Sequence, residues 1–327
     1  MNMIMITGAF GMVGSALKKH IENRCEETYL LCPTRQELDL EDRDNVRAYI
    51  LKYRPDIIFH LAARVGGVLD NSLYPADYYT QNIKINTNVL EAAKELALFW
   101  NDSLTVVSVM STCVYPDNAT YPLTEDQMHS GPPHPSNFAY AYTKRMLDVQ
   151  SMAYRKQHGI NFITVIPNNI YGEGDFYGYG CHVVPALMSR FHKAKLNESV
   201  SVEIWGDGTP LREFTFAPDI ARDLYKVARS YSYRYAENMG EVGPINIGNT
   251  KEISILDLAK TIKEVIGYRG DIVFDPSKPA GQFRKPSSVE RFNKVLGKVG
   301  YTELKNGLEI TYEWFKKNYP NLRGVKK

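Results

Sequence analysis

The 327-residue sequence lacks the features of secreted, membrane-bound or nucleic-acid-binding proteins. Its four cysteines, Cys25, Cys32, Cys113 and Cys181, are spaced neither as a metal site nor as a disulfide framework. No apolar stretch approaches the ~20 residues of a membrane span, and the N-terminus has no charged segment or cleavage site of a signal peptide. The net charge of +2 creates no field that attracts nucleic acid or anionic lipid. We therefore expect a cytoplasmic protein that binds no metal, membrane or nucleic acid.

Short apolar runs alternate with helical patterns in the first half of the chain. Strands are predicted at Met3–Thr7, Thr28–Cys32, Asp56–Ala62, Leu104–Met110 and Phe162–Pro167. Long helices are predicted over 75–98 and 138–158, where apolar residues recur at helical spacing. This alternation predicts an α/β fold with a doubly wound parallel sheet, in which functional residues gather beyond the carboxyl ends of the strands. The basic tail 323–327 is interpreted as a frayed terminus.

A glycine-rich turn follows the first predicted strand. Gly8, Gly11 and Gly14 are spaced as G-x-x-G-x-x-G, with Met12 and Val13 between the last two. In a strand–turn–helix context, such glycines let the backbone approach the phosphates of a dinucleotide, which bind at the helix N-terminus. The alternative is a turn that needs glycine only for its positive φ. The context favours a cofactor site formed by these five residues.

The end of the second predicted strand indicates which dinucleotide binds. Pro33, Thr34 and Arg35 stand there, without the carboxylate that would accept a hydrogen bond from a ribose 2′-hydroxyl. A guanidinium at this place suits a 2′-phosphate, so Arg35 favours NADPH over NADH. The alternative for Arg35 is a solvated charge in a loop.

A hydroxyl, a phenol and an ammonium occur in the order that hydride chemistry at a carbonyl requires. Ser111 ends the fourth predicted strand, and Tyr140 and Lys144 lie one turn apart on the helix predicted after it. The phenol can donate a proton to the oxygen as it becomes an alkoxide, and the ammonium is expected to lower the pKa of the phenol towards working pH. A Tyr-x-x-x-Lys pair arises easily by chance among 22 tyrosines, but the ordered set predicts an oxidoreductase.

Two domains are expected, because the chain is long for one hydrophobic core and the regular alternation loosens after residue 170. Residues 1–171 together with about 214–248 form the predicted Rossmann domain, which binds the NADP cofactor. Residues 172–213 and 249–327 form a smaller predicted domain, which binds the substrate.

Motifs spread over almost the whole chain give a more specific indication. They are Leu61–Gly67, Ser111–Pro116, Tyr140–Lys144, Pro167–Gly172, His182–Leu187, Trp205–Phe214 and Lys278–Lys285. In these motifs the sequence resembles the GDP-L-fucose synthases, the GDP-4-keto-6-deoxy-mannose 3,5-epimerase 4-reductases of the extended short-chain dehydrogenase/reductase family. The Ser-x-Cys pattern at 111–113 and the His-Val-x-Pro pattern at 182–185 separate this family from related epimerases and dehydratases.

The resemblance implies NADPH-dependent epimerisation and 4-reduction of a GDP-4-keto-6-deoxy-sugar to GDP-L-fucose by a homodimer that associates through 75–98 and 138–158. It implies that Cys113 and His182 are the acid and base that invert carbons 3 and 5, beside Ser111, Tyr140 and Lys144. Further cofactor contacts are implied for Leu61, Ala62, Ala63, Pro167, Asn169 and His182. Contacts with the GDP-sugar are implied for Asn169, Arg190, Trp205, Arg212 and Lys285.

One loop departs from the family pattern. Where the family has Gly-Pro-His-Asp-Asn-Phe, this chain has a segment rich in glycine and aromatic residues over 172–180, shortly before His182. Reduction of another GDP-4-keto sugar, such as a heptose or a dideoxyhexose, with or without epimerisation, is therefore an alternative. A non-catalytic protein that senses the dinucleotide through the same fold is a second alternative.

Overall fold

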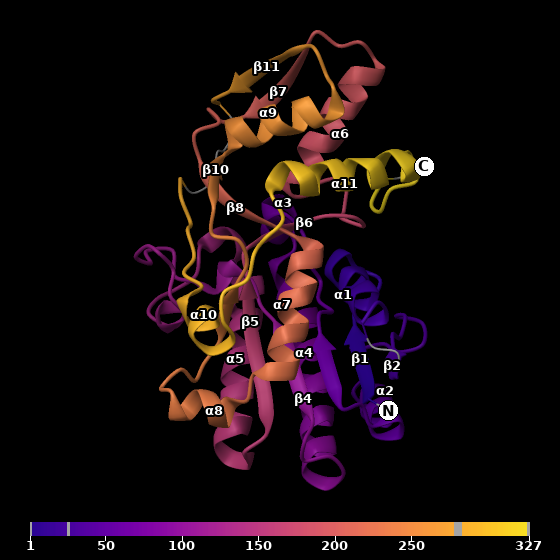
Figure 1. Cartoon of the computed structure of the whole chain (residues 1–327), viewed down its shortest axis with the longest axis vertical. Helices are drawn as coiled ribbons and strands as arrows, with labels where there is room; N and C mark the ends of the chain where they lie inside the picture. Colours follow the sequence, from indigo (N-terminus) through magenta and orange to yellow (C-terminus); the bar gives the residue numbers. More distant parts are fainter. Residues whose placement is uncertain (1, 25–26, 278–282, 326–327) are drawn as a thin grey trace.

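The computed structural model describes residues 2–24, 27–277 and 283–325, and its larger lobe contains a six-stranded parallel sheet (Figure 1). The strands are β1 (Asn2–Thr7), β2 (Thr28–Leu31), β3 (Ile57–His60), β4 (Thr105–Val109), β5 (Asn161–Pro167) and β9 (Ile245–Ile247). Their order is β2-β1-β3-β4-β5-β9, and every neighbouring pair is parallel. The predicted α/β fold is confirmed, and each of the five predicted strands is present with ends shifted by at most two residues.

Helices cover both faces of this sheet. One face carries α2 (Arg43–Tyr53), α4 (Pro75–Phe99) and α5 (Phe138–His158), and the other carries α1 (Met12–Glu22) and α7 (Ala217–Ser230). The strands are apolar on both sides, because alternate residues point to opposite faces. In β1, Met5 joins the core beneath α2, α4 and α5, whereas Ile4 and Ile6 join the core beneath α1 and α7.

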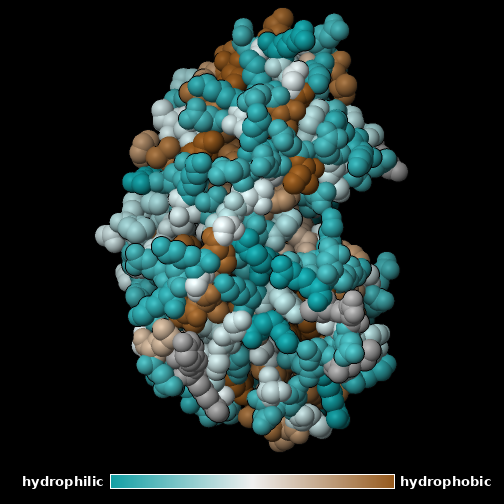
Figure 2. All heavy atoms as spheres, viewed as in Figure 1, coloured by the Kyte–Doolittle hydropathy of each residue, from teal (hydrophilic) through white to brown (hydrophobic). Residues whose placement is uncertain are grey.

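A smaller lobe lies at the carboxyl ends of the sheet strands (Figure 1). Its strands are β6 (Asn169–Tyr171), β8 (Leu211–Phe216) and β10 (Glu252–Ser254) in one sheet, and β7 (Ser201–Trp205) and β11 (Asp271–Asp275) in a parallel pair. Its helices are α6 (Val183–Leu196), α9 (Ile255–Ile266) and α11 (Leu304–Asn318). They share a third apolar core, centred on Phe191, Leu258 and Phe315. Figure 2 shows that the outline of the molecule is indented where this lobe meets the larger one, between α11 and α1.

Short elements complete the described chain. They are the helices α3 (Val68–Leu73), α8 (Tyr233–Asn238) and α10 (Glu290–Leu296), and the 3-10 turns η1 (Thr112–Val114), η2 (Glu125–Gln127) and η3 (Pro135–Asn137). Within residues 2–24, 27–277 and 283–325, no helix is long and apolar enough to cross a membrane. In the same ranges no cluster of His, Cys, Asp and Glu is arranged to hold a metal ion. Cys32, Cys113 and Cys181 are free thiols, and Cys25 lies outside the described residues.

The glycine turn between β1 and α1 is closed by its own backbone. Gly8 has a φ of +72°, and its carbonyl accepts a hydrogen bond of 3.0 Å from the amide of Gly11. Gly14, in the first turn of α1, packs against the same carbonyl. A Cβ on Gly14 would stand 2.2 Å from the Gly8 oxygen and 2.7 Å from Cα of Ala9. Both neighbouring atoms belong to the backbone, so neither can move aside cheaply.

Replacing Gly14 by alanine should therefore destabilise the fold. We expect Gly14→Ala to lower the free energy of unfolding by about 1–3 kcal/mol, because α1 must be displaced from the end of β1. Gly300→Ala is the matched control, since a Cβ at Gly300 meets nothing within 4 Å, and it should change stability by less than about 0.5 kcal/mol. Urea denaturation of both variants measures the difference. Equal stability of the two variants would contradict the tight packing at Gly14.

Candidate active site

The carboxyl ends of β1 and β3 bring two predicted cofactor loops together. A Cβ on Gly8 would stand 3.0 Å from the amide nitrogen of Ala62. The hydroxyl of Thr7 accepts hydrogen bonds from the amides of Leu61 and Ala62, at 3.1 and 3.2 Å. The loop after β3, which continues into Ala63, is therefore fixed against the glycine turn. This contact leaves no room for a side chain at Gly8.

Arg35 lies in the loop after β2, as predicted, and its guanidinium forms an ion pair with Glu41 at 2.9 Å. The Arg35 side chain is 77% exposed, so this pair contributes little to stability. A phosphate group could therefore compete for the guanidinium at small cost.

Lys144 and Tyr140 lie on α5 beside the end of β4. The buried ammonium of Lys144 donates a hydrogen bond of 2.8 Å to the carbonyl of Val109, the last residue of β4. Its nitrogen lies 5.7 Å from the centre of the Tyr140 ring. Two residues beyond Val109, Ser111 caps η1, where its hydroxyl accepts a long hydrogen bond of 3.5 Å from the amide of Cys113. The predicted hydroxyl, phenol and ammonium are thus placed around the end of one strand.

Burial decides the protonation of these groups. It raises the pKa of the Tyr140 phenol well above its ordinary value, and the neighbouring Cys113 and Tyr78 act in the same direction. It lowers the pKa of Lys144 to about 8. The expectation that the ammonium lowers the pKa of the phenol is wrong for this structure, because burial, Cys113 and Tyr78 all raise that pKa. Tyr140 is consequently a protonated phenol at neutral pH, as a proton donor must be.

A buried polar chain links the glycine turn to α5. His60 Nδ1 lies 3.0 Å from the hydroxyl of Thr7, and His60 Nε2 lies 3.1 Å from Oδ1 of Asn86 on α4. The Asn86 amide in turn donates to the carbonyl of Thr143, next to Lys144, at 3.0 Å. Burial and the charge of Lys144 lower the pKa of His60 to about 4, so its ring is neutral. Sequence reasoning missed this chain, although a histidine inside the apolar run 57–61 was a signal for it.

Cys113 lies between the dehydrogenase-type residues and the cations of the smaller lobe. Its thiol is buried, and burial raises its pKa, while the hydroxyl of Ser111 and the charges of Lys285 and Lys144 act in the opposite direction. Burial lowers the pKa of Lys285, and Arg212 lowers it further. The charge of Lys285 therefore acts on Cys113, and Arg212 lies close enough to Lys285 to influence it. The first part of their motif, 278–282, lies outside the described residues.

His182 stands at the N-terminus of α6, just after the atypical loop. The side chain of His182 is accessible to solvent, but surrounding protein atoms desolvate its ring and lower its pKa. A side chain with both properties lies in a recess of the surface. The loop before it meets the loop after β3: a Cβ on Gly67 would stand 2.0 Å from the carbonyl oxygen of Gly180. His182 is thereby carried on a segment that rests against the predicted cofactor loop.

Two other predicted substrate residues form a pair of their own. The Arg190 guanidinium lies 5.5 Å from the ring centre of Trp205 and donates to the carbonyl of Glu203 at 3.2 Å. Both side chains are exposed. Asn169, by contrast, lies at the start of β6, and its amide donates to the backbone carbonyl of Glu213 at 2.8 Å. Pro167 ends β5 and is buried beside β9.

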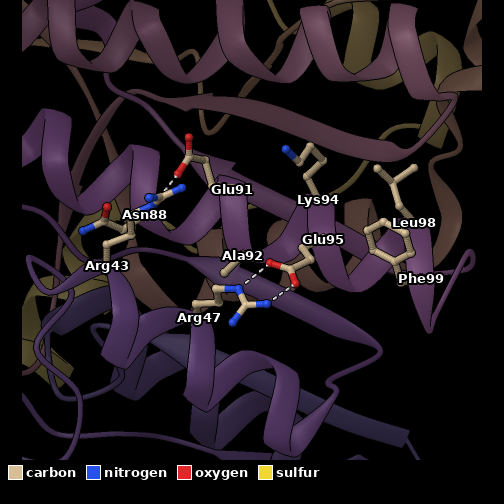
Figure 3. Close-up of a pocket in the computed structure, with 9 residues that line it drawn as sticks. All are labelled: Arg43, Arg47, Asn88, Glu91, Ala92, Lys94, Glu95, Leu98 and Phe99. Carbon is tan, nitrogen blue, oxygen red and sulfur yellow. Dashed lines mark hydrogen bonds and ion pairs between the residues drawn. The ribbon is translucent and has the colours of Figure 1, made fainter.

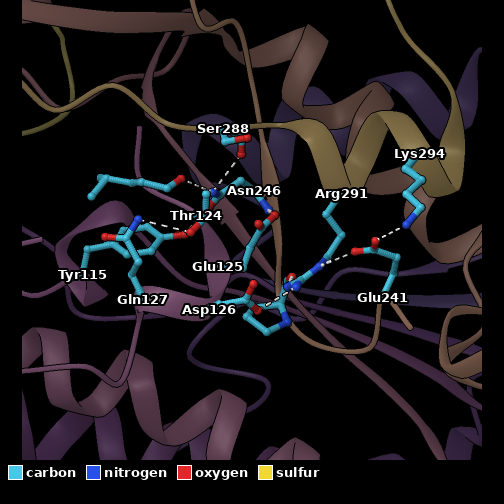
Figure 4. A network of polar contacts seen from close by, with 12 residues as sticks. Tyr115, Thr124, Glu125, Asp126, Gln127, Glu241, Asn246, Ser288, Arg291 and Lys294 are labelled. Atoms are coloured by element: carbon cyan, nitrogen blue, oxygen red, sulfur yellow. Dashed lines mark hydrogen bonds and ion pairs between the residues drawn. The ribbon is translucent and has the colours of Figure 1, made fainter. Parts of the chain in front are cut away.

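The segment that carries Cys113 is fixed by a polar network (Figure 4). Tyr115, two residues after Cys113, donates its hydroxyl to Oδ1 of Asn246 at 2.6 Å. The backbone amide of Asn246 donates to the buried carboxylate of Glu125 at 2.8 Å, and its side-chain amide donates to the carbonyl of Ser288 at 2.9 Å. Residues 115, 246 and 288 are thus held together although they are distant in sequence. None of these network residues was predicted.

Comparison with known proteins agrees with this geometry. A family model described as the NAD dependent epimerase/dehydratase family matches residues 4–248. The chain belongs to this family. A GDP-L-fucose synthase from Dictyostelium discoideum is 36% identical over 325 residues, which are 98% of this chain and 97% of the relative. Members of the family with solved structures cover the whole molecule as well.

Two of these structures differ in the sugar that they act on. A GDP-L-fucose synthetase from Naegleria fowleri bound to NADP has a TM-score of 0.89 and 33% identity, and covers 98% of this chain and 95% of its own. A GDP-6-OMe-4-keto-L-xylo-heptose reductase from C. jejuni has a TM-score of 0.88 and 28% identity, and covers 97% of this chain and 98% of its own. The fold and family are shared by both, so the fold alone does not identify the sugar.

A surface pocket of about 350 Å³ lies elsewhere, between α2 and α4 (Figure 3). Its polar rim is formed by two ion pairs, Arg43 with Glu91 at 3.1 Å and Arg47 with Glu95 at 2.5 Å. The pocket contains none of the site residues that the sequence motifs predict. We therefore place the functional site at the carboxyl ends of the strands.

The atypical loop and the C-terminal tail pack on each other, which corrects the prediction of a frayed tail. The amide of Tyr177 donates to the carbonyl of Arg323 at 2.8 Å, and Leu322 is buried in the third core. A Cβ on Gly324 would stand 2.2 Å from the ring of Phe176. The tail is therefore docked through residue 325, and only Lys326 and Lys327 lie outside the described residues.

Asp175, in the same loop, should make stability depend on pH. Burial raises the pKa of its carboxyl from 3.8 to about 7 despite the nearby Arg323, and one carboxyl oxygen has no hydrogen-bond partner. Because the folded protein binds this proton more tightly than the unfolded chain, stability falls as pH rises between about 4 and about 7. We expect Asp175→Asn, which mimics the protonated acid, to be more stable than wild type by on the order of 4 kcal/mol at pH 8 and equal to it near pH 4.

Thermal or urea unfolding of both proteins across this pH range measures the effect. Asp271→Asn is the matched control, because the Asp271 side chain is exposed on β11. A difference between Asp175→Asn and wild type that does not change with pH would contradict the prediction.

Proposed function

We propose that the protein is an NADPH-dependent 3,5-epimerase and 4-reductase that converts GDP-4-keto-6-deoxy-D-mannose to GDP-L-fucose. The observation that carries the proposal is the position of Cys113. This buried thiol lies beside Ser111, Tyr140 and Lys144, and beside the cations Lys285 and Lys144 that favour its ionised form. A reductase that moved only a hydride would have no use for an acid–base thiol at this place.

The glycine turn fits a dinucleotide. Gly8 and Gly14 let the turn close tightly on the loop after β3 and on its own backbone, at the N-terminus of α1 where anions bind. Arg35 is available for a 2′-phosphate, which supports NADPH over NADH. The bound NADPH supplies the hydride that reduces carbon 4. Lys144 orients the nicotinamide ribose, and Asn169 and His182 belong to the loops on the nicotinamide side.

Tyr140 donates the proton in the reduction. The pKa of its phenol is raised, so at neutral pH the proton is present for transfer to oxygen 4 as that oxygen becomes an alkoxide. The hydroxyl of Ser111 stabilises the same oxygen. Removal of a proton from carbon 3 or carbon 5 makes an enolate whose negative charge lies on oxygen 4. Ser111 and Tyr140 therefore serve the epimerisation and the reduction with one hydrogen-bonding arrangement.

Inversion of a carbon requires an acid and a base on opposite sides of the sugar ring. We assign these roles to Cys113 and His182, which reach the site from different lobes, the thiol from the end of β4 and the imidazole from the start of α6. The GDP group is assigned to Arg190, Trp205, Arg212 and Lys285. These residues supply an aromatic surface for the base and positive charge for the diphosphate.

A second candidate is reduction of another GDP-4-keto sugar, such as a heptose. The observation that favours it is the loop 172–180, whose packing on the C-terminal tail was not anticipated and which precedes His182. A change in this loop alters the wall that faces the sugar. Incubation with NADPH and a panel of GDP-4-keto sugars, with product stereochemistry determined by NMR, distinguishes the two. Oxidation of NADPH with any of these sugars would exclude a non-catalytic nucleotide sensor.

We also propose a homodimer that associates through α4 and α5. Tyr142 and Met146 lie one turn apart on α5 with exposed side chains, and Tyr79 is exposed on α4. An apolar surface of this kind favours association with a second copy. Sedimentation analysis measures the oligomeric state directly.

Reduction should depend on Tyr140. Tyr140→Phe keeps the ring packed against Tyr78 and removes only the proton donor. We expect the rate of 4-reduction to fall on the order of 10²-fold or more, with NADPH affinity nearly unchanged. Tyr29→Phe, at an exposed position on β2, is the matched control and should keep the wild-type rate. Near-normal reduction by Tyr140→Phe would show that the proton comes from another group.

Epimerisation should depend on Cys113 and should be separable from reduction. In deuterated buffer without NADPH, wild type should exchange the protons at carbons 3 and 5 of the 4-keto sugar, and Cys113→Ser should not, because a serine hydroxyl has far too high a pKa to act as the base. Since burial raises the pKa of the thiol, the exchange rate of wild type should keep rising with pH above neutrality. His182→Gln should impair reprotonation and leave partly epimerised species.

The matched control is Cys32→Ser, which removes a half-buried thiol outside the site. With NADPH, Cys113→Ser should still reduce carbon 4 slowly and yield the unepimerised GDP-6-deoxy sugar. If wild type itself exchanges neither proton, the protein is a simple 4-reductase and the epimerase part of the proposal is wrong.

A further inference from the structure

The docked C-terminal tail ends beside the glycine turn, although more than 300 residues separate them in sequence. Nη1 of Arg323 lies 3.9 Å from the point where a Cβ on Gly11 would stand. Gly11 is the residue that caps α1, so the guanidinium lies near the helix N-terminus, where the first backbone amides have no partner within the helix. Figure 1 shows the tail reaching this region from the end of α11.

The backbone of Arg323 is held in place by contacts of the residues on both sides of it. Its carbonyl accepts the 2.8 Å hydrogen bond from Tyr177, and the preceding Leu322 is buried. Gly324, which follows it, is wedged against Phe176. The backbone on both sides of Arg323 is therefore anchored, while its own side chain is exposed.

The atypical loop 172–180 also lies against the start of α1. A Cβ on Gly174 would stand 3.8 Å from Cα of Met12 and 3.8 Å from the hydroxyl of Ser15, both in the first turn of α1. Next in the loop is Asp175, whose buried carboxyl has one oxygen without a hydrogen-bond partner and is influenced by the charge of Arg323. The guanidinium thus lies near Asp175, whose burial favours the neutral acid, and near the glycine turn.

We propose that Arg323 binds the pyrophosphate of the dinucleotide cofactor, and that the tail 320–325 with the loop 173–178 forms the outer wall of the pyrophosphate site. This inference rests on the proposed function, which supplies the dinucleotide. A guanidinium presents paired N–H groups that match two phosphate oxygens. The glycine turn offers backbone N–H groups to the phosphates from the opposite side. Arg35 then binds the 2′-phosphate, and Arg323 binds the pyrophosphate.

Three probes separate these two arginines. ADP-ribose carries the pyrophosphate alone, adenosine 2′-phosphate carries the 2′-phosphate alone, and 2′-phospho-ADP-ribose carries both. We expect Arg323→Gln to weaken binding of ADP-ribose and 2′-phospho-ADP-ribose about 10-fold and to leave adenosine 2′-phosphate unchanged. Arg35→Ala should show the reverse pattern, weakening only the two probes with a 2′-phosphate. Isothermal titration calorimetry with the full-length protein measures each Kd.

Arg323→Lys and Arg269→Gln are the companion variants. The lysine keeps the charge but not the paired geometry, so its loss of affinity for ADP-ribose should lie between those of wild type and Arg323→Gln. Arg269→Gln makes the same charge change at an exposed arginine of the smaller lobe and should bind all probes as wild type does. Thermal unfolding of each variant without probe shows whether the tail remains docked.

The outcomes distinguish this inference from the proposed function. If wild type binds 2′-phospho-ADP-ribose and Arg323→Gln binds it and ADP-ribose equally well, the role of Arg323 is overturned while the proposed cofactor stands. Equal weakening of all three probes would also overturn it, because the substitution would then act through the fold. If wild type binds none of the probes, both the cofactor of the proposed function and the role of Arg323 are overturned.

Discussion

The buried chain of hydrogen bonds from Thr7 through His60 and Asn86 to the carbonyl of Thr143 fixes the geometry on which the site depends. At one end, Thr7 holds the loop after β3 against the glycine turn; at the other, the chain reaches the helix turn that carries Lys144. The chain works only with a neutral His60 ring, which accepts from Thr7 and donates to Asn86. Its lowered pKa is thus a condition for the arrangement, since a protonated ring would have no acceptor for Thr7. Loss of one member would leave buried partners unsatisfied at a cost of about 1–3 kcal/mol each.

The second half of the site is held by contacts of the same kind between segments that are far apart in sequence. Asn246 joins the Cys113 segment to Ser288, and Glu213 joins β8 to Ser287 through hydrogen bonds of 2.9 and 2.6 Å. Lys285 precedes that serine by two residues, so its ammonium is positioned by the same anchor. The cations of the smaller lobe are therefore connected rigidly to the strands of the larger one. A site assembled in this way keeps its reacting groups in register without a ligand to organise it.

The features that could be predicted from the sequence are those that depend on residues close together in the chain. The helix 138–158 was predicted with its correct ends, because a periodic apolar face and the Gly159 stop are local signals. The glycine turn was predicted for the same reason. The docking of Arg323 was not, because it depends on a loop 146 residues earlier in the chain whose motif was atypical. The direction of the Tyr140 pKa was also predicted wrongly. The spacing of Tyr140 and Lys144 can be read in the sequence, whereas the burial that raises the pKa of Tyr140 arises only in the folded chain.

Desolvation acts on five titratable side chains of the candidate site in the direction of their neutral forms. It raises the pKa values of Cys113 and Tyr140 and lowers those of Lys144, Lys285 and His182. Groups in their neutral forms cost little free energy to bury, but a neutral thiol cannot accept a proton. An anion that enters between Lys285 and Arg212 stabilises the ammonium of Lys285 and raises its pKa. The charged ammonium in turn stabilises the thiolate of Cys113. In the proposed function, the diphosphate of the substrate is this anion, so its binding is coupled to ionisation of Cys113.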